Sequence, residues 1–166
     1  MKQDQNIVVV AHNIRSALNI GSIFRICDAC AVSKLYLTGY TPHPRIQNDK
    51  RLNFEIEKIE QKILKAGLEG FKHTKYEYEN KIEDLINNLK NESYKIIAVE
   101  QNKNSTNIYD FKIEQNTALI LGNEVTGVEQ NVLNICDDII EIPMKGKGKS
   151  LNVAVSLAVC LYTISH

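Results

Sequence analysis

The sequence lacks three features that would each place it in a large class of proteins: a membrane-length apolar run, a signal peptide and an excess of one charge. No apolar run approaches the roughly 20 residues that span a bilayer, and the N-terminal segment has no long apolar core. We therefore expect a cytoplasmic protein. Lysine and arginine total 20, as do aspartate and glutamate. Because no overall positive field results, any nucleic-acid binding must come from a local patch.

The sequence also has no evident internal repeat or low-complexity segment. Its 166 residues, 43% of them apolar, are enough for one domain with an adequate core. We expect a single domain over residues 1–166.

Cysteine is scarce, but two of the four cysteines, Cys27 and Cys30, have the C-x-x-C spacing of redox and zinc sites. No second such pair and no ligand-spaced histidine pair accompanies them, so we expect no metal. Burial is the alternative explanation. On a helix over residues 19–31, both cysteines share an apolar face with Ile20, Ile23 and Phe24.

Short apolar runs rich in β-branched residues predict strands, and amphipathic stretches between them predict helices. Because the two alternate, the sequence predicts an α/β fold with a mostly parallel sheet and helices on both faces. The predicted strands are 7–10, 34–37, 74–78, 95–99, 118–121 and 139–142, and the predicted helices are 19–31, 54–66, 81–91, a segment after 126 with Val132, Leu133 and Ile135, and 151–164.

Two glycine-containing loops follow the last two predicted strands. In the first, 122–127, Thr126 can cap the next helix. The second begins at Pro143, which ends its strand, and contains three lysines and two glycines over 144–149. A strand end, a glycine-rich loop and a helix start are typical of ligand sites in open α/β sheets.

The last helix, 151–164, has apolar residues all round its circumference, so we expect it to be buried. Ser150 or Asn152 can cap it. The sequence Gly148-Lys149-Ser150 is similar to the end of a P-loop, which holds nucleotide phosphates. However, the first glycine of that motif would fall at position 143, which is proline. A P-loop-like nucleotide-binding protein is therefore the weaker alternative.

Three segments together resemble the motifs of the SpoU/TrmH family of RNA ribose methyltransferases, within the SPOUT superfamily. They are NIGSIFR at 19–25, LGNEVTG at 121–127, and IPM at 142–144 continuing to SLNVA at 150–154. The resemblance covers most of residues 6–164, and residues 45–75 match poorly.

This resemblance implies a deep trefoil knot in the C-terminal part, S-adenosylmethionine as cofactor, and a homodimer with active sites at its interface. It implies methylation of a ribose 2′-hydroxyl in tRNA or rRNA. A knotted module that binds RNA or a partner without catalysis is the alternative. The residues that would surround the cofactor are Leu121, Gly122, Ile142, Met144, Ser150 and Leu151.

The resemblance assigns the chemistry to Arg25, with Asn19, Glu124, Ser150 and Asn152 around it. A protonated guanidinium cannot accept a proton, so Arg25 is either an unusual deprotonated base or a clamp for a phosphate. We prefer the clamp. Structural alternatives are an ion pair of Arg25 with Asp28, helix capping by Asn19 and Asn152, and loop stapling by Glu124.

A local positive patch is expected to bind the RNA despite the zero net charge. Tyr76 and Tyr78 alternate as in a strand, and packing explains them better than base stacking does. The residues expected in the RNA patch are Arg15, Arg25, Arg45, Lys145, Lys147 and Lys149.

Overall fold

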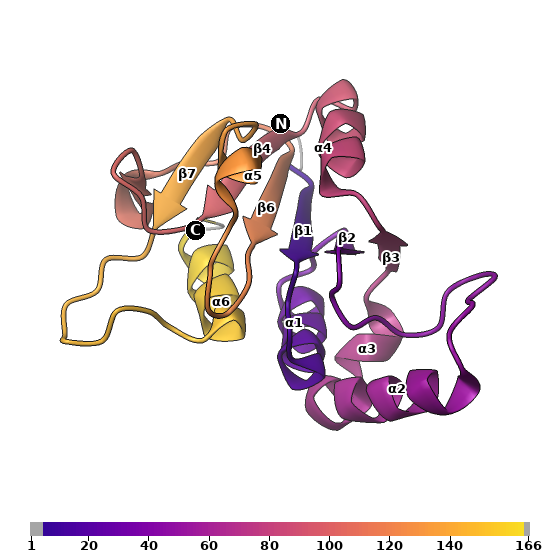
Figure 1. Cartoon of the computed structure of the whole chain (residues 1–166). Helices are drawn as coiled ribbons and strands as arrows, with labels where there is room; N and C mark the ends of the chain where they lie inside the picture. The colour runs from indigo at the N-terminus through magenta and orange to yellow at the C-terminus, as the bar shows by residue number, and fades with distance from the viewer. Residues whose placement is uncertain (1–4, 165–166) are drawn as a thin grey trace.

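Seven strands form one sheet in which neighbouring strands are parallel, and helices cover both of its faces (Figure 1). The computed structural model describes residues 5–164. The spatial order is β3-β2-β1-β6-β4-β7-β5, and the predicted fold class is confirmed. The strands are β1 (Ile7–His12), β2 (Lys34–Thr38), β3 (Tyr76–Glu79), β4 (Lys95–Val99), β5 (Thr106–Asn107), β6 (Thr117–Leu121) and β7 (Asp138–Glu141).

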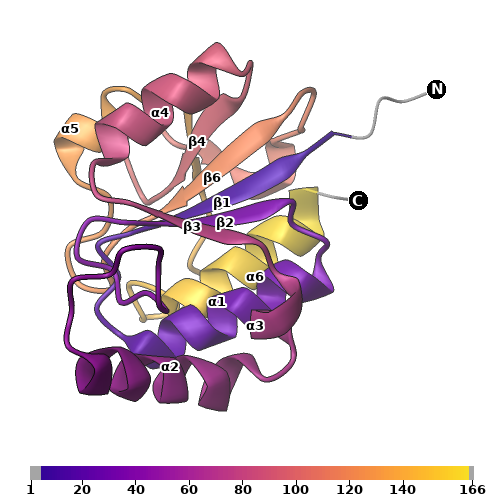
Figure 2. The same ribbon diagram turned by 90° about the vertical axis from the view of Figure 1, so that its right-hand side faces the viewer.

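The helices lie in two groups, with α1, α2, α3 and α6 on one face of the sheet and α4 and α5 on the other (Figure 2). Strand β1 contributes side chains to the hydrophobic clusters on both faces of the sheet. Val9 packs in the cluster with α1 and α6, whereas Val8 and Val10 pack in the cluster with α4. The helices are α1 (Ala17–Ala29), α2 (Asn53–Gly67), α3 (Gly70–His73), α4 (Ile82–Asn91), α5 (Gln130–Leu133) and α6 (Val153–Ile164), with a 3-10 turn η1 (Ile108–Asp110).

Helix α2 lies outside α1, and a close backbone contact sets its position. A Cβ on Gly21 of α1 would come within 2.4 Å of the Ile63 carbonyl oxygen on α2. Gly67 of α2 faces the same point, since its Cβ would lie 3.0 Å from the Gly21 oxygen. The absence of side chains at both glycines therefore lets α2 run close beside the first turns of α1.

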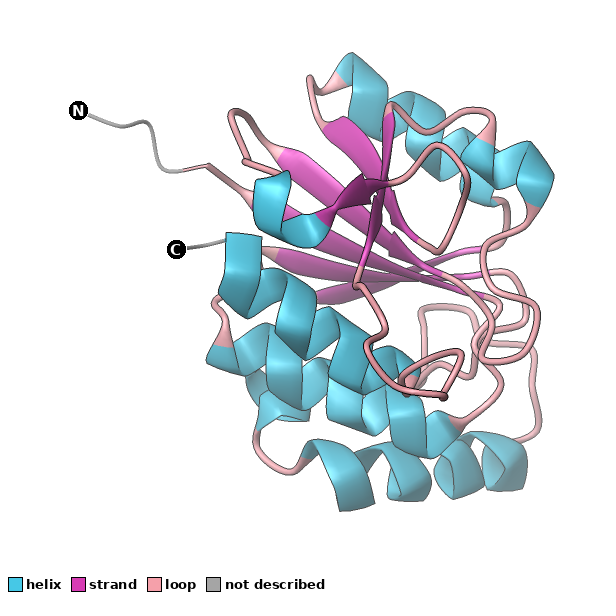
Figure 3. Cartoon of the chain, turned by 90° about the vertical axis from the view of Figure 1, so that its left-hand side faces the viewer, coloured by secondary structure: helices cyan, strands magenta, loops and turns pink. Residues whose placement is uncertain are grey.

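The carboxyl ends of β4, β6 and β7 meet at one edge of the sheet, because the strands are parallel and β4 pairs with both others. The segments that follow these strands are therefore neighbours, and connecting loops gather at this edge in Figure 3. The knot implied by the family resemblance stays a prediction. Within residues 5–164, no helix is long and apolar enough to cross a membrane.

The first helix begins two residues earlier than predicted. Its N-cap is Ser16, whose side chain accepts a hydrogen bond from the Asn19 amide at 3.3 Å. Asn19 therefore lies inside the helix, and the alternative that it caps the helix is wrong. The buried face includes Ile20, Phe24 and Cys27, as expected, while Cys30 is half-buried. Burial raises the pKa of the Cys27 thiol, which is consistent with packing rather than reactivity.

The helix after the 122–127 loop is shorter and starts later than predicted. α5 follows Glu129 at the N-cap position, so Thr126 does not cap it and Ile135 lies beyond its end. The Thr126 amide instead donates to Asn123 Oδ1 at 3.0 Å. Asparagine side chains readily hydrogen-bond backbone groups two or three residues on, and this local turn replaces the expected cap.

Helix α6 is capped by Asn152, whose Oδ1 accepts a hydrogen bond from the Ala154 amide at 2.9 Å. The prediction that α6 is buried on all sides is wrong for the single chain. Leu157 and Leu161 are buried against α1 and the sheet, but Val155 is 47% exposed and Tyr162 is 57% exposed. The apolar circumference therefore includes a face that the chain itself does not cover.

Three elements, α3, β5 and η1, were not predicted. Each has two to four residues, too few to establish a hydrophobic period. The other predicted strands and helices agree with the structure to within two residues at each end.

Candidate active site

A cavity lies at the carboxyl edge of the sheet, bounded by the segments after β4, β6 and β7 and by the start of α6. Two of the expected catalytic residues, Glu124 and Ser150, line it. The six residues expected to hold the cofactor come from three different segments, and all of them line this one cavity: Leu121, Gly122, Ile142, Met144, Ser150 and Leu151.

The turn 122–127 owes its shape to Asn123 and to two glycines. Asn123 exchanges two backbone hydrogen bonds with Gly127, and its Oδ1 accepts from the Val125 amide at 2.8 Å. A Cβ on Gly122 would lie 2.3 Å from the Gly127 carbonyl carbon, so no side chain fits there. Gly127 has φ +71°, a left-handed conformation that favours glycine. The turn can therefore present backbone closely to the cavity.

Three expected catalytic residues from separate segments form one hydrogen-bonded chain. Asn19 on α1 donates from Nδ2 to Glu124 Oε1 at 2.8 Å, and Asn152 donates from Nδ2 to Asn19 Oδ1 at 3.1 Å. These bonds link α1, the turn after β6 and the start of α6. For Asn152 the capping alternative also holds, because its Oδ1 caps α6.

Glu124 is held as a carboxylate. It also accepts hydrogen bonds from the backbone amides of Arg15 at 2.8 Å and Ser16 at 3.0 Å. Burial by itself raises its pKa, but the hydrogen bonds from Arg15, Asn19 and Ser16 outweigh burial, and the pKa is lowered. A carboxylate with a lowered pKa and several bonds already made is a poor proton acceptor. This geometry favours the stapling role.

The loop 142–152 projects as a long open segment between β7 and α6 (Figure 1). Its lysines, Lys145, Lys147 and Lys149, are exposed, and none of them has an ion-pair partner within the described chain. One tie holds the loop to the sheet edge, because Gln101 Nε2 donates to the Lys149 carbonyl at 2.7 Å.

Sequence reasoning missed Glu100 and Gln101, which follow β4 and line the same cavity. Glu100 Oε2 accepts from the Val128 amide at 2.9 Å, while Gln101 reaches the 142–152 loop. The two residues thus tie both glycine-containing loops to β4. Their only signal was that they are polar residues directly after a buried strand, because this segment lacks the glycines that drew attention to the other two loops.

Arg25 stands apart from the other expected catalytic residues. It is exposed on α1, is not among the residues that line the cavity, and lies six residues after Asn19, about 9 Å along the helix. The alternative of an ion pair with Asp28 is wrong, because Asp28 Oδ1 lies 3.5 Å from His73 Nδ1 and no ion pair involves Arg25 among residues 5–164.

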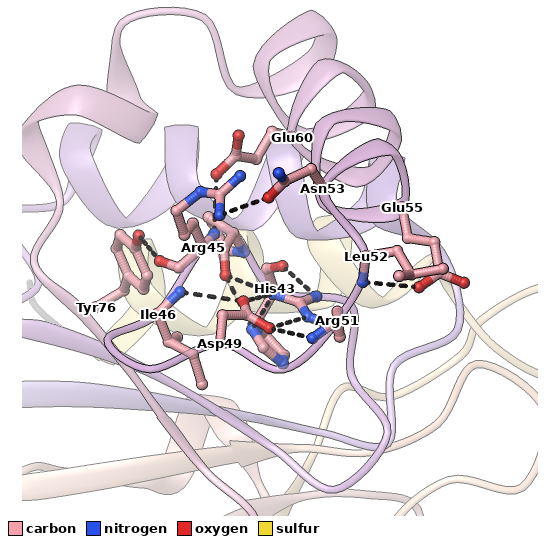
Figure 4. A network of polar contacts seen from close by, with 11 residues as sticks. His43, Arg45, Ile46, Asp49, Arg51, Leu52, Asn53, Glu55, Glu60 and Tyr76 are labelled. Carbon is pink, nitrogen blue, oxygen red and sulfur yellow. Dashed lines mark hydrogen bonds and ion pairs between the residues drawn. The ribbon is translucent and has the colours of Figure 1, made fainter.

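Arg45 belongs to a polar network in the loop before α2, which Figure 4 shows from close by. Its Nη1 donates to Asn53 Oδ1 at 3.2 Å, and its carbonyl accepts from the Tyr76 hydroxyl at 3.1 Å. Arg51 organises the same loop by donating to the His43 and Pro44 carbonyls.

The Arg51 guanidinium also holds the pKa of Asp49 below its usual range. The hydroxyl of Tyr78 donates to the Gly39 carbonyl at 2.7 Å, and its ring stacks on His43. The network therefore serves packing, which was the preferred explanation of the two tyrosines.

A model of the SpoU rRNA Methylase family matches residues 6–162. The chain belongs to this family. It is 30% identical over 164 residues to a tRNA (guanosine(18)-2'-O)-methyltransferase of Aquifex aeolicus, covering 97% of this chain and 69% of that protein. The three motifs thus identified the SpoU family correctly. A P-loop is also disfavoured by the structure, because α6 begins at Val153, three residues after Ser150.

Solved structures agree with the SpoU assignment. An A. aeolicus TrmH/SpoU tRNA modifying enzyme matches with a TM-score of 0.78 at 27% identity, covering 98% of this chain and 75% of that one. An AdoMet-bound rRNA methyltransferase from Sinorhizobium meliloti has a TM-score of 0.82 at 21% identity and shares the fold. That match covers 98% of this chain but only 56% of the Sinorhizobium chain.

Proposed function

We propose that this SpoU-family chain is an S-adenosylmethionine-dependent RNA methyltransferase that methylates a ribose 2′-hydroxyl of tRNA or rRNA. The observation that carries the proposal is the single cavity on which the six residues assigned to the cofactor converge. The Aquifex relative is named a tRNA 2'-O-methyltransferase, and the Sinorhizobium structure is described as AdoMet-bound. The Aquifex name supports the reaction, and the Sinorhizobium description supports the methyl donor.

The lining of the cavity suits S-adenosylmethionine. Glu100 and Glu124 place carboxyl groups beside it, which favours a ligand with a positively charged sulfur. The turn 122–127, which Gly122 allows to close tightly, lines the cavity, so its backbone N–H and C=O groups can meet the polar atoms of a ligand. Apolar surface for an adenine ring comes from Leu121, Ile142, Met144 and Leu151.

Bound S-adenosylmethionine supplies a methyl group already activated by the positive charge on its sulfur. The protein must hold the ribose hydroxyl in line and favour loss of its proton. We assign Asn19, Glu124 and Asn152 to positioning, because their hydrogen-bonding atoms are engaged with one another and with backbone. Ser150 lines the cavity without a hydrogen-bond partner within the described residues, so it is assigned to contact with the reactants.

We assign Arg25 to a phosphate beside the methylated ribose rather than to proton removal. A guanidinium carries its proton at neutral pH, and its planar fork matches two phosphate oxygens. A deprotonated Arg25 acting as the base is the alternative. The RNA patch would combine it with the exposed side chains of Arg15, Arg45, Lys145, Lys147 and Lys149.

We also propose a homodimer of single-domain chains, working in the cytoplasm where its RNA is found. Its support is the apolar surface that one chain leaves uncovered on α6, where Val155 is 47% exposed and Tyr162 is 57% exposed. Arg25 is exposed on α1, the helix that packs beside α6. A partner covering this surface would bring Arg25 of one chain close to the partner, which explains why Arg25 stands apart from the cavity of its own chain.

The test is transfer of tritiated methyl groups from S-adenosylmethionine to unfractionated tRNA and rRNA, followed by mapping of methylated riboses. The proposal expects methylation at one nucleotide position, detected as a phosphodiester bond that resists alkaline cleavage. Donor binding without transfer to either RNA would favour the non-catalytic module instead.

A further inference from the structure

A second hollow lies between the start of α1 and the exposed side of α2. It is separate from the methyl-donor cavity, and none of its lining residues comes from the loops after β4, β6 or β7. Four of its lining residues carry the argument: Arg15, Phe54, Lys58 and Lys62. We call this hollow the α2 groove.

The side of α2 that lines the α2 groove is positively charged. Phe54, Lys58 and Lys62 recur every four residues, and Lys65 follows three residues later, so all four share one side of the helix. Within residues 5–164, none of these lysines has an ion-pair partner. Arg15 lines the groove from the segment just before α1 and has no such partner either. The charges are therefore available to an anionic ligand.

Of the three acidic residues of α2, Glu55, Glu57 and Glu60, only Glu55 lines the groove. Glu60 lies on the opposite side of the helix, where its Oε1 accepts from the Arg45 amide at 2.8 Å. Glu55 lines the groove, but its Oε2 is directed back to the Leu52 amide at 3.2 Å.

Phe54 gives the α2 groove an aromatic surface. Its side chain is 64% exposed and takes part in no ring contact within the described residues, unlike Phe24, Phe71 and Tyr76, which pack edge to face or stacked. An exposed aromatic ring one helical turn before Lys58 and two turns before Lys62 matches what single-stranded nucleic acid requires, namely a stacking surface for a base and cations for its phosphates.

Hydrogen bonds join the lining of the α2 groove to that of the methyl-donor cavity. Arg15 and Ser16 line the groove, and their backbone amides donate to Glu124, which lines the cavity. The groove is therefore near enough to the cavity for a nucleotide next to the methylated one.

We propose that the α2 groove binds a single-stranded nucleotide next to the methylated one, with its base stacked on Phe54 and its phosphates at Arg15, Lys58 and Lys62. This site rests on the proposed function, which it extends to residues 54–65, where the family motifs give no assignment. It adds a substrate-binding surface that is carried by α2 rather than by the loops of the cavity.

The test is binding of a fluorescein-labelled single-stranded oligoadenylate, followed by anisotropy over a range of salt concentrations. Replacing Lys58 and Lys62 together by Gln should lower the slope of log K against log salt by about 1.4, the value for two lost phosphate contacts on a single strand. Phe54→Ala should weaken binding about tenfold, and Phe54→Tyr should restore it. The matched control replaces Lys75 and Lys112 by Gln as well. These two exposed lysines precede β3 and β6, and so lie toward the amino ends of the strands.

Equal binding and equal salt slopes for the groove variant and the Lys75/Lys112 control would overturn the proposal. A change of oligomeric state with unchanged RNA binding would overturn it too, and would assign the groove to a protein contact. Donor binding is measured on the same variants by calorimetry and should be unaltered. Because RNA binding is read without methyl transfer, a failure of the proposed reaction and a failure of the groove remain distinguishable.

Discussion

Glu124 accepts hydrogen bonds from two backbone amides and one side-chain amide, and these bonds lower its pKa. The folded state therefore prefers the carboxylate, so its contribution to stability is present above the unfolded pKa of about 4.3 and is lost as pH falls through the lower folded pKa. A residue used in this way determines where α1 and the turn 122–127 sit relative to each other.

Glu124→Gln should place an amide NH₂ against one of these backbone donors. We expect a loss of about 1 to 2 kcal/mol in the free energy of unfolding at pH 7 and a smaller difference from the wild type under acid conditions. Urea unfolding at several pH values measures this. A difference that grows as the pH falls would contradict the assignment.

At the scale of the element, α6 depends on Asn152 for its cap, while the same side chain reaches Asn19 across to α1. Asn152→Ala removes both contacts and should cost about 1 kcal/mol of stability. Asn152→Asp keeps a capping oxygen but loses the donor to Asn19. This variant should fold nearly as stably as the wild type but transfer methyl groups about tenfold more slowly than the wild type. Thermal unfolding and single-turnover methylation separate the two roles. Full activity in the Asp variant would show that Asn152 acts only as a helix cap.

The elements that the sequence predicted well are those with a long hydrophobic signal. β4 and β6 are short runs of mostly apolar residues, so their bounds follow from the length of each run, whereas the bounds of α4 follow from its helical period. β5 has two residues and no period, and it exists because β7 offers an edge to pair with. The cap at Thr126 failed because Glu100 Oε2 accepts from the Val128 amide, one of the amides that a capping Thr126 would bind, and Glu100 reaches it only through the tertiary structure.

At the scale of the whole molecule, the sequence placed most of the site but not all of it. Motif residues located both glycine-containing loops, whereas Glu100 and Gln101 lie outside every motif and come into the cavity only because β4 pairs beside β6 and β7. The sequence likewise did not reveal the exposed apolar side of α6. An apolar pattern all round a helix does not distinguish residues buried by their own chain from residues buried by a partner.

The proposed homodimer makes a prediction about mixed chains. If Arg25 of one chain serves the cavity of the other, Arg25→Ala and the cavity variant Leu151→Glu should each be inactive alone. Statistical mixing gives half heterodimers with one intact site each, hence about one quarter of wild-type activity. Methyl transfer by the co-refolded mixture is the measurement. A mixture that stays inactive, although sedimentation shows heterodimers, would place Arg25 and the cavity of the same chain in one site.

The central claim is that the cavity between the loops after β4, β6 and β7 holds the methyl donor, and calorimetric titration of S-adenosylmethionine tests it most directly. Two glycines provide matched variants, because a Cβ at Gly122 would lie 2.3 Å from backbone, whereas at Gly146 it would meet nothing within 4 Å. We predict one donor molecule per chain, unchanged affinity for Gly146→Ala, and affinity reduced at least about tenfold for a folded Gly122→Ala. Equal affinity in both variants, or no binding heat with the wild type, would contradict the account.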